Sequence, residues 1–354
     1  FTFPMKCLRK FFFPSKTFIP RAYTHSQVSN EYSKYRSFFD ENGFVVIPQF
    51  ISRAGCKAMM KQMDGLIRNW DPAELLAFKT DSNQESAQGS SAYFLESGDK
   101  VNFYLEPEAL DTSGAIKSSI PKSAAINKAG HGLHIADEVF KAYSESYEVS
   151  SLVRALGWEH PVLPQSMYIF KQPHIGEVVT SHQDSCFLFT TPRQTCLGLW
   201  LALEDATLEN GCLWARPGSH KESIRRQFHR NPEYFEKGQG SMLVFTDLEP
   251  KGTVPFEGSL PEGEDPSAGG FEAVPVKQGD LFVIHGALDH LSLPNHSDKS
   301  RHTFQLHLVE GPNAGVTWDA GNWLQLPKGT PFPPIPPPEL TKKFNDVTSL
   351  KAGL

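Results

Sequence analysis

The sequence predicts a mainly β fold with flanking helices, and two observations lead to this prediction. In the second half of the chain, short apolar or alternating runs follow one another between Gly, Pro, Asn and Asp residues, as in a sandwich or barrel. In one of these runs Phe304, Leu306 and Leu308 alternate with Gln305 and His307, which is the two-residue period of a half-buried strand. In the first half, apolar residues recur instead at helical spacing.

The elements of the first half are mostly helical. Ser52 is a favourable N-cap, and the apolar face that follows it predicts a helix to about Trp70. Asp71-Pro72 predicts the start of a further helix, because Asp is favoured at the N-cap and Pro in the first turn. The other elements expected here are a helix at 29–40, a turn at 42–43, a strand at 44–47, a loop at 80–91 and a helix at 148–156.

Strands are expected along the second half, and the runs that predict them are 167–170, 196–203, 211–215, 241–245, 271–276, 279–285 and 302–308. Residues 250–270 are rich in Gly, Pro and Glu and predict a long loop. Proline dominates the chain after Trp323, so we expect residues 327–354 to form an extended tail. One domain is therefore expected over residues 29–326.

Residues 1–28 differ in composition from the rest of the chain. They contain basic and hydroxyl residues, several Phe and no acidic residue, which is typical of a mitochondrial transit peptide. A disordered basic tail is the alternative for this segment. We therefore expect a mitochondrial location, with the cytoplasm as the alternative.

The composition of the whole chain argues against several other classes of protein. The net charge of -6 argues against a nucleic-acid-binding surface, which is usually basic. No apolar run approaches ~18 residues, so no membrane span is expected. The cysteines are scattered, odd in number and lack a Cys-x-x-Cys pair, which favours a reducing compartment and disfavours a Cys-based zinc site.

His182 and Asp184 are the first candidates for a metal site. They lie at the start of an extended run, where residues i and i+2 project from the same face and can reach one ion. Spacing alone is a weak signal, because His296-x-Asp298 and His220-x-Glu222 also fit it. Those two pairs lie among turn-forming residues, which favours the first pair.

A second imidazole would complete the set, and either His285 or His290 could supply it. His285 ends a predicted strand and is expected to pack there, so we favour His290. Two imidazoles and a carboxylate with open positions beside them are typical of non-haem Fe(II) oxygenases. Arg301 adds a fixed cation for a distant carboxylate, and the combination indicates 2-oxoglutarate. A surface salt bridge is the ordinary alternative for Arg301.

Several longer motifs resemble the phytanoyl-CoA dioxygenase family, over about residues 35–326. They comprise residues 93–100, 126–131, 165–174, 182–184, 199–207, 210–213, 217–220, 285–290 and 300–301. The resemblance implies a double-stranded β-helix core of the jelly-roll, cupin-like type. It also implies that His182, Asp184 and His290 hold iron and that Arg301 holds 2-oxoglutarate, with Lys128, Met167 and Trp200 lining the cosubstrate pocket.

The activity implied is that of an Fe(II)- and 2-oxoglutarate-dependent dioxygenase. It would hydroxylate a small molecule with O2, release succinate and CO2, and use ascorbate as a reductant. An acyl-CoA is one substrate that the family suggests, by analogy alone. Arg225, Arg226 and Arg230 could contact a phosphate, although a solvated basic helix face is the simpler interpretation. The alternatives are a zinc-dependent hydrolase and a cupin-like protein that binds a metal without turnover.

Overall fold

The computed structural model describes residues 31–71, 75–79, 88–250, 256 and 263–346. The targeting expectation for residues 1–28 therefore lies outside the described residues, as do most of the loops expected at 80–91 and 250–270. The helix expected from Asp71-Pro72 is wrong where it can be checked, because residues 75–79 are not helical and Ala77 forms a β-bridge with Leu105. In the described part of the chain, no helix is long and apolar enough to cross a membrane.

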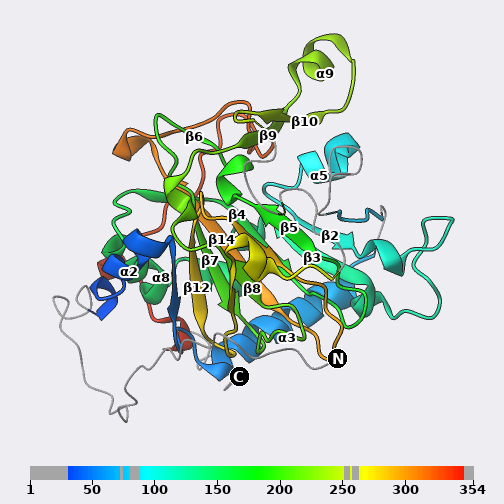
Figure 1. The fold of residues 1–354 in the computed structure, drawn as a ribbon, viewed down its shortest axis with the longest axis horizontal. Coiled ribbons are helices and arrows are strands. Elements are labelled where there is room, and N and C mark those ends of the chain that lie inside the picture. Colours follow the sequence, from blue (N-terminus) through cyan, green and yellow to red (C-terminus); the bar gives the residue numbers. More distant parts are fainter. Residues whose placement is uncertain (1–30, 72–74, 80–87, 251–255, 257–262, 347–354) are drawn as a thin grey trace.

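Two antiparallel β-sheets form the centre of the molecule (Figure 1). The larger sheet has the strand order β1-β12-β7-β14-β4-β3-β2, and the smaller has the order β11-β8-β13-β5. The strands of the larger sheet, in this order, are Phe44–Ile47, Leu281–His285, Leu197–Ala202, Thr303–Glu310, Pro161–Ile169, Ile126–His131 and Val101–Leu105. Those of the smaller sheet are Glu272–Val274, Leu213–Ala215, His290–Ser292 and Val179–His182. This architecture confirms the mainly β prediction and is consistent with a jelly-roll core.

The register of the larger sheet sets a row of side chains on its inner face. Trp200 on β7 pairs with Gln305 on β14, and Gln305 pairs with Met167 on β4. The next row, two residues further along each strand, pairs His307 on β14 with Gly198 on β7. Because residues i and i+2 of a strand share a face, both rows project toward the smaller sheet.

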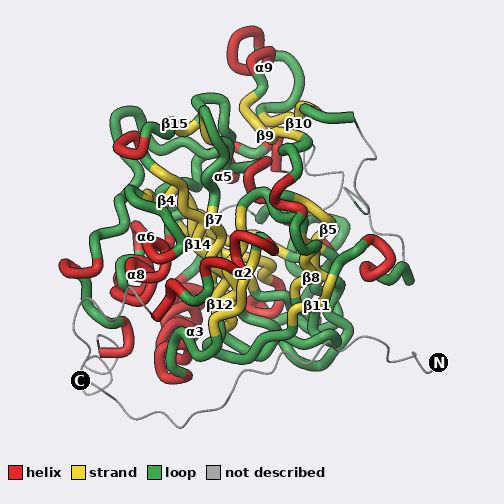
Figure 2. Tube along the Cα trace, turned by 60° about the vertical axis from the view of Figure 1, so that its left-hand side comes forward, coloured by secondary structure: helices red, strands yellow, loops and turns green. Residues whose placement is uncertain are grey.

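Helices cover the outer face of the larger sheet (Figures 1 and 2). They include α3 (Arg53–Asn69), α7 (Glu138–Ser144) and α8 (Tyr147–Ala155). The Ser52 side chain accepts a hydrogen bond from the Gly55 amide, as the predicted N-cap requires. On α7, the Phe140 ring lies 4.8 Å from the ring of Phe304 on β14, centroid to centroid. The main apolar core thus lies between this helical layer and the larger sheet.

Several predicted elements differ from the structure. The helix expected at 29–40 is interrupted by a turn at Lys34 and Tyr35, and α2 spans Arg36–Asn42. The run 167–170 is the end of a longer strand, β4. The sequence analysis also missed β2, β3, β5 and β13, because these strands are short or carry Gly, Lys, His and Ser where apolar alternation would be expected.

The basic residues at 225–230 form no helix face, so that interpretation was wrong. They begin the strand β9 (Arg226–Arg230), which pairs with β10 (Leu243–Asp247). The connection between these two strands, which contains α9 (Pro232–Lys237), projects from the body of the molecule in both views (Figures 1 and 2).

The proline-rich C-terminal segment is extended but lies against the domain as far as it is described. The Ile335 amide donates to Pro161 O, and the Ile335 side chain is buried. Further on, the Phe344 ring is fully buried beside Tyr143. Residues 333–344 therefore contribute to the core and do not form a free tail.

Candidate metal and cosubstrate site

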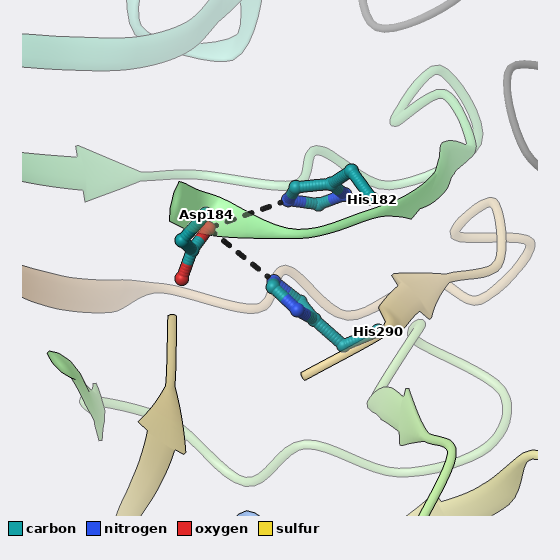
Figure 3. A group of neighbouring side chains, drawn as sticks. All are labelled: His182, Asp184 and His290. Carbon is teal, nitrogen blue, oxygen red and sulfur yellow. Dashed lines mark ion pairs between the residues drawn. The ribbon is translucent and has the colours of Figure 1, made fainter. Parts of the chain in front are cut away.

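Two adjacent strands of the smaller sheet bring the two imidazoles together. His182 ends β5 and pairs directly with His290, the first residue of β13. Their ring centroids are 4.2 Å apart. After His182 the chain turns into the short 3₁₀ helix Asp184–Cys186, which carries the carboxylate toward both rings (Figure 3).

The three side chains converge on one point (Figure 3). Asp184 Oδ1 lies 3.5 Å from His182 Nε2 and 3.6 Å from His290 Nε2. The three ligand atoms all lie within 4.8 Å of one another, and no other such group of His, Cys, Asp or Glu occurs among the described residues. This donor set is the one expected for a facial triad.

Backbone hydrogen bonds orient both imidazoles. His182 Nδ1 donates to Thr180 O at 2.8 Å, and His290 Nδ1 donates to Leu288 O at 3.1 Å. Since these bonds place the proton on Nδ1, the Nε2 lone pair of each ring faces the carboxylate and is free to bind a metal. Burial, together with the neighbouring His182, lowers the pKa of His290 to about 4, which keeps it neutral near pH 7.

The other histidine–acid pairs are placed elsewhere. His296 and Asp298 are exposed, and Asp298 lies 2.8 Å from His174. Glu222 forms an ion pair with Arg216, and the His220 ring lies near the ring of His285 at a tilted angle. His285 packs near the ring of Phe39, as expected, and takes no part in the group of converging ligands.

His307 and Gly198 complete the surroundings of the carboxylate, and the sequence analysis assigned neither. His307 Nε2 lies 3.1 Å from Asp184 Oδ2, although the contact is not aligned as a hydrogen bond. A Cβ atom at Gly198 would lie 3.3 Å from the same oxygen, so the glycine makes room for the carboxylate. Burial alone would raise the pKa of Asp184, but His307 and His290 hold it well below its ordinary value. The position of His307 on the polar side of its alternating run was the available signal.

Arg301 is buried just before β14, at the end of the inner face. Its guanidinium lies 5.1 Å from the Trp200 ring centroid, and Nη1 donates to Gly211 O at 2.6 Å. Burial lowers the pKa of Arg301 to about 10, so the group stays charged at neutral pH. The nearest alternative, an exposed salt bridge, is wrong because the side chain is almost fully buried and forms no ion pair among the described residues.

Lys128 and Met167 lie on the same inner face. Lys128 Nζ is 3.7 Å from Met167 Sδ and 3.4 Å from the centroid of the Phe78 ring. Burial holds the pKa of Lys128 well below its ordinary value, and no carboxylate of a described residue lies within ion-pair distance of it.

One cavity of about 180 Å³ connects these groups. Its lining includes the three converging side chains, Arg301, Lys128, Met167 and Trp200, all of which the sequence analysis assigned. Aromatic side chains form much of the remaining wall, among them Phe94, Phe187, Phe228 and Trp323. The cavity therefore has cationic and metal-binding groups on one part of its wall and apolar rings on another.

A buried ion-pair network supports the segment before His290. Asp289 has no exposed side-chain surface and is bound by both Arg216 and Arg225. The Asp289 amide donates a hydrogen bond to Ser219 Oγ at 2.9 Å. The Arg225 guanidinium is therefore paired with Asp289 inside the protein, which argues against the phosphate contact considered for it from sequence.

Comparison with known proteins agrees with this geometry. The model of the family described as phytanoyl-CoA dioxygenase (PhyH) matches residues 39–303. The chain belongs to the phytanoyl-CoA dioxygenase family. As a member of this family it is an oxidoreductase of the dioxygenase class.

Relatives within the phytanoyl-CoA dioxygenase family match over nearly their whole length. Phytanoyl-CoA dioxygenase domain-containing protein 1 of Mus musculus is 40% identical over 302 residues, covering 84% of this chain and 96% of the relative. Phytanoyl-CoA dioxygenase of Arabidopsis thaliana is 40% identical over 291 residues, covering 82% and 92%.

Solved structures support the fold. The non-heme alpha-ketoglutarate-dependent carbocyclase SnoK from nogalamycin biosynthesis aligns with a TM-score of 0.53 at 18% identity, covering 90% of this chain and all of that one. The epimerase SnoN, whose structure was solved with Fe3+, alpha-ketoglutarate and nogalamycin RO, aligns with a TM-score of 0.52 at 14% identity, covering 87% and 94%.

Proposed function

We propose that this chain is an Fe(II)- and 2-oxoglutarate-dependent dioxygenase that hydroxylates a small molecule and releases succinate and CO2. The observation that carries the proposal is the convergence of His182, Asp184 and His290 in one cavity with the buried cation of Arg301. A metal site alone would not need that arginine.

The donor set suits Fe(II), because two neutral imidazoles and one carboxylate leave coordination positions open. When bound, iron with the 2-oxo acid and O2 would supply the oxidant for C–H hydroxylation. The role of the chain is to hold the metal through two preoriented Nε2 atoms and Asp184 Oδ1. His307 Nε2 lies 3.1 Å from Asp184 Oδ2 and would orient the carboxylate.

Arg301 would bind the distal carboxylate of 2-oxoglutarate through its planar guanidinium, which can donate to both oxygens. The Trp200 ring already lies near that guanidinium. Met167 lies on the same face of the larger sheet, two strands from Trp200. We assign Lys128 to the same pocket, where its ammonium would find the anionic partner that the described residues do not provide. Ascorbate as reductant stays a prediction.

The relatives' names suggest an acyl-CoA as substrate, and we propose it as one candidate by this analogy alone. The aromatic part of the cavity wall supports an apolar reacting group of some kind. Phe228 on β9 lines the cavity, and α9, which projects beyond it, would be available to contact a larger substrate.

The test is 2-oxoglutarate consumption and succinate release by the chain loaded anaerobically with Fe(II) and then exposed to O2. His182→Ala, Asp184→Ala and His290→Ala should each abolish it, whereas His296→Ala, which changes an exposed histidine, should not. Hydrolytic activity with Zn(II) alone would favour the zinc hydrolase. Metal binding without 2-oxoglutarate consumption under any condition would favour a binding protein.

A further inference from the structure

His131 lines the cavity but has no part in the metal or cosubstrate assignments above. It ends β3 and has no exposed surface. Three aromatic rings surround it: Trp323 at 5.0 Å, Phe94 at 5.3 Å and Tyr104 at 5.6 Å between centroids. A polar ring is thus placed in the apolar part of the wall.

The contacts of Ser97 lead us to assign the proton of His131 to Nδ1. The Ser97 hydroxyl donates its single proton to Phe94 O at 2.6 Å. The same hydroxyl oxygen lies 2.7 Å from His131 Nδ1. With the hydroxyl proton used in this way, Nδ1 is the donor in that contact, and we adopt this assignment. Burial, with Lys128 and His307 nearby, holds the pKa of His131 well below its ordinary value, so the ring is neutral.

It follows that His131 Nε2 carries a lone pair. This nitrogen is buried, and no described residue donates a hydrogen bond to it. A buried acceptor without a donor costs free energy, and native structures rarely leave one. Because the ring lines the cavity, the missing donor can come from a molecule bound there.

A neighbouring lysine amine narrows the chemistry of that molecule. Lys128 Nζ lies near two of the three rings that surround His131. It is 5.4 Å from the centroid of the Tyr104 ring and 5.8 Å from that of the Phe94 ring. The Lys128 amine has at least two donor hydrogens, so it can serve the cosubstrate and a second ligand together. A hydroxyl group suits this pair, because its oxygen can accept from Lys128 while its hydrogen is donated to His131.

We propose that His131 Nε2 recognises a hydroxyl group on the primary substrate, and that an apolar or ring-shaped part of this alcohol or phenol lies against Phe94 and Trp323. This inference deepens the proposed function and rests on it. His131 is a specificity-determining residue in this proposal, since it contacts the substrate away from the metal.

The protonation of His131 can be tested without any ligand. Long-range 1H–15N NMR of the full chain, with His131→Phe to assign the signal, should show a protonated Nδ1 and a bare Nε2. A protonated Nε2 would overturn the proposal. Ser97→Ala removes the acceptor for Nδ1–H and should allow the proton to move to Nε2 in part of the population.

Ligand recognition is tested with phenol and its methyl ether, anisole, as probes. The full chain is loaded with Mn(II) and 2-oxoglutarate, and paramagnetic relaxation of the probe protons reports binding near the metal. Phenol should bind about five- to tenfold more tightly than anisole, the worth of one net hydrogen bond. His131→Phe should remove that preference, and Ser97→Ala should reduce it. His174→Phe, an exposed histidine outside the cavity, is the matched control.

Equal binding of phenol and anisole by the native chain, or absence of phenol binding near the metal, would overturn the proposal. So would a phenol preference that survives in His131→Phe. If His131→Phe fails to fold, as judged by its thermal midpoint, the Ser97→Ala comparison decides. Failure here is distinguishable from failure of the proposed function, because phenol binding is measured without O2 and turnover is measured on the native chain alone.

Discussion

Replacing His307 with Leu tests whether the larger sheet positions the metal-binding carboxylate. His307 Nε2 lies 3.1 Å from Asp184 Oδ2, while Asp184 Oδ1 faces the two other imidazoles. His307→Leu removes this partner and leaves Oδ2 buried beside an apolar side chain. A hydrogen bond to a charged group is worth about 1.5–3 kcal/mol, and loss of residues that orient metal ligands typically costs about 10–100-fold in affinity. Because the contact is not well aligned, we expect a loss of about tenfold.

The assay is an anaerobic titration with Fe(II) in the presence of 2-oxoglutarate, followed by the visible charge-transfer band. His307→Gln keeps an N–H donor and should recover part of the affinity. Thr303→Val is the matched control, because Thr303 is buried on the same face of β14 and lies outside the cavity. If His307 had only a structural role, His307→Leu would lower the thermal midpoint without changing the metal affinity measured from the band. Native metal affinity in a folded His307→Leu protein would refute the reasoning.

Three further predictions concern other residues. Arg301→Ala should keep metal affinity but weaken 2-oxoglutarate binding roughly 30-fold or more, since losing a buried charge pair costs about 2–5 kcal/mol. Arg301→Lys should recover only part of this affinity. Unchanged 2-oxoglutarate affinity in the Ala variant would mean that another group anchors the cosubstrate. Gly198→Ala would place a methyl group 3.3 Å from Asp184 Oδ2 and 3.4 Å from Ile284 Cβ, so metal affinity measured by titration should fall; native affinity would show that the carboxylate has room to move. Phe344→Ala removes a fully buried ring and should lower the free energy of unfolding by about 3–5 kcal/mol in denaturant titrations; a loss below about 1 kcal/mol would mean that the C-terminal segment is dispensable.

Local sequence patterns were sufficient for several elements. The N-cap at Ser52 and the buried face of α3 depend on residues close together in the chain, so both could be predicted. The alternation around Phe304 likewise predicted β14, since strand periodicity is a local property. Strands such as β3 and β13 were missed because their inner faces carry polar side chains of the cavity in place of apolar ones.

By itself, the sequence determined the type of chemistry. The His-x-Asp pair, a later histidine and an arginine supply the ligands for iron and a dicarboxylate, and motif context favoured His182 over His296 and His220. Pairing of β5 with β13 was needed to place His290, and not His285, opposite His182. Only the tertiary structure placed His307 and Gly198 against Asp184 and left His131 Nε2 buried without a partner among the described residues. His307 and Asp184 are far apart in the chain, Gly198 meets Asp184 only because a different strand carries it there, and the state of His131 depends on which donor is already used, so no local pattern encodes these contacts.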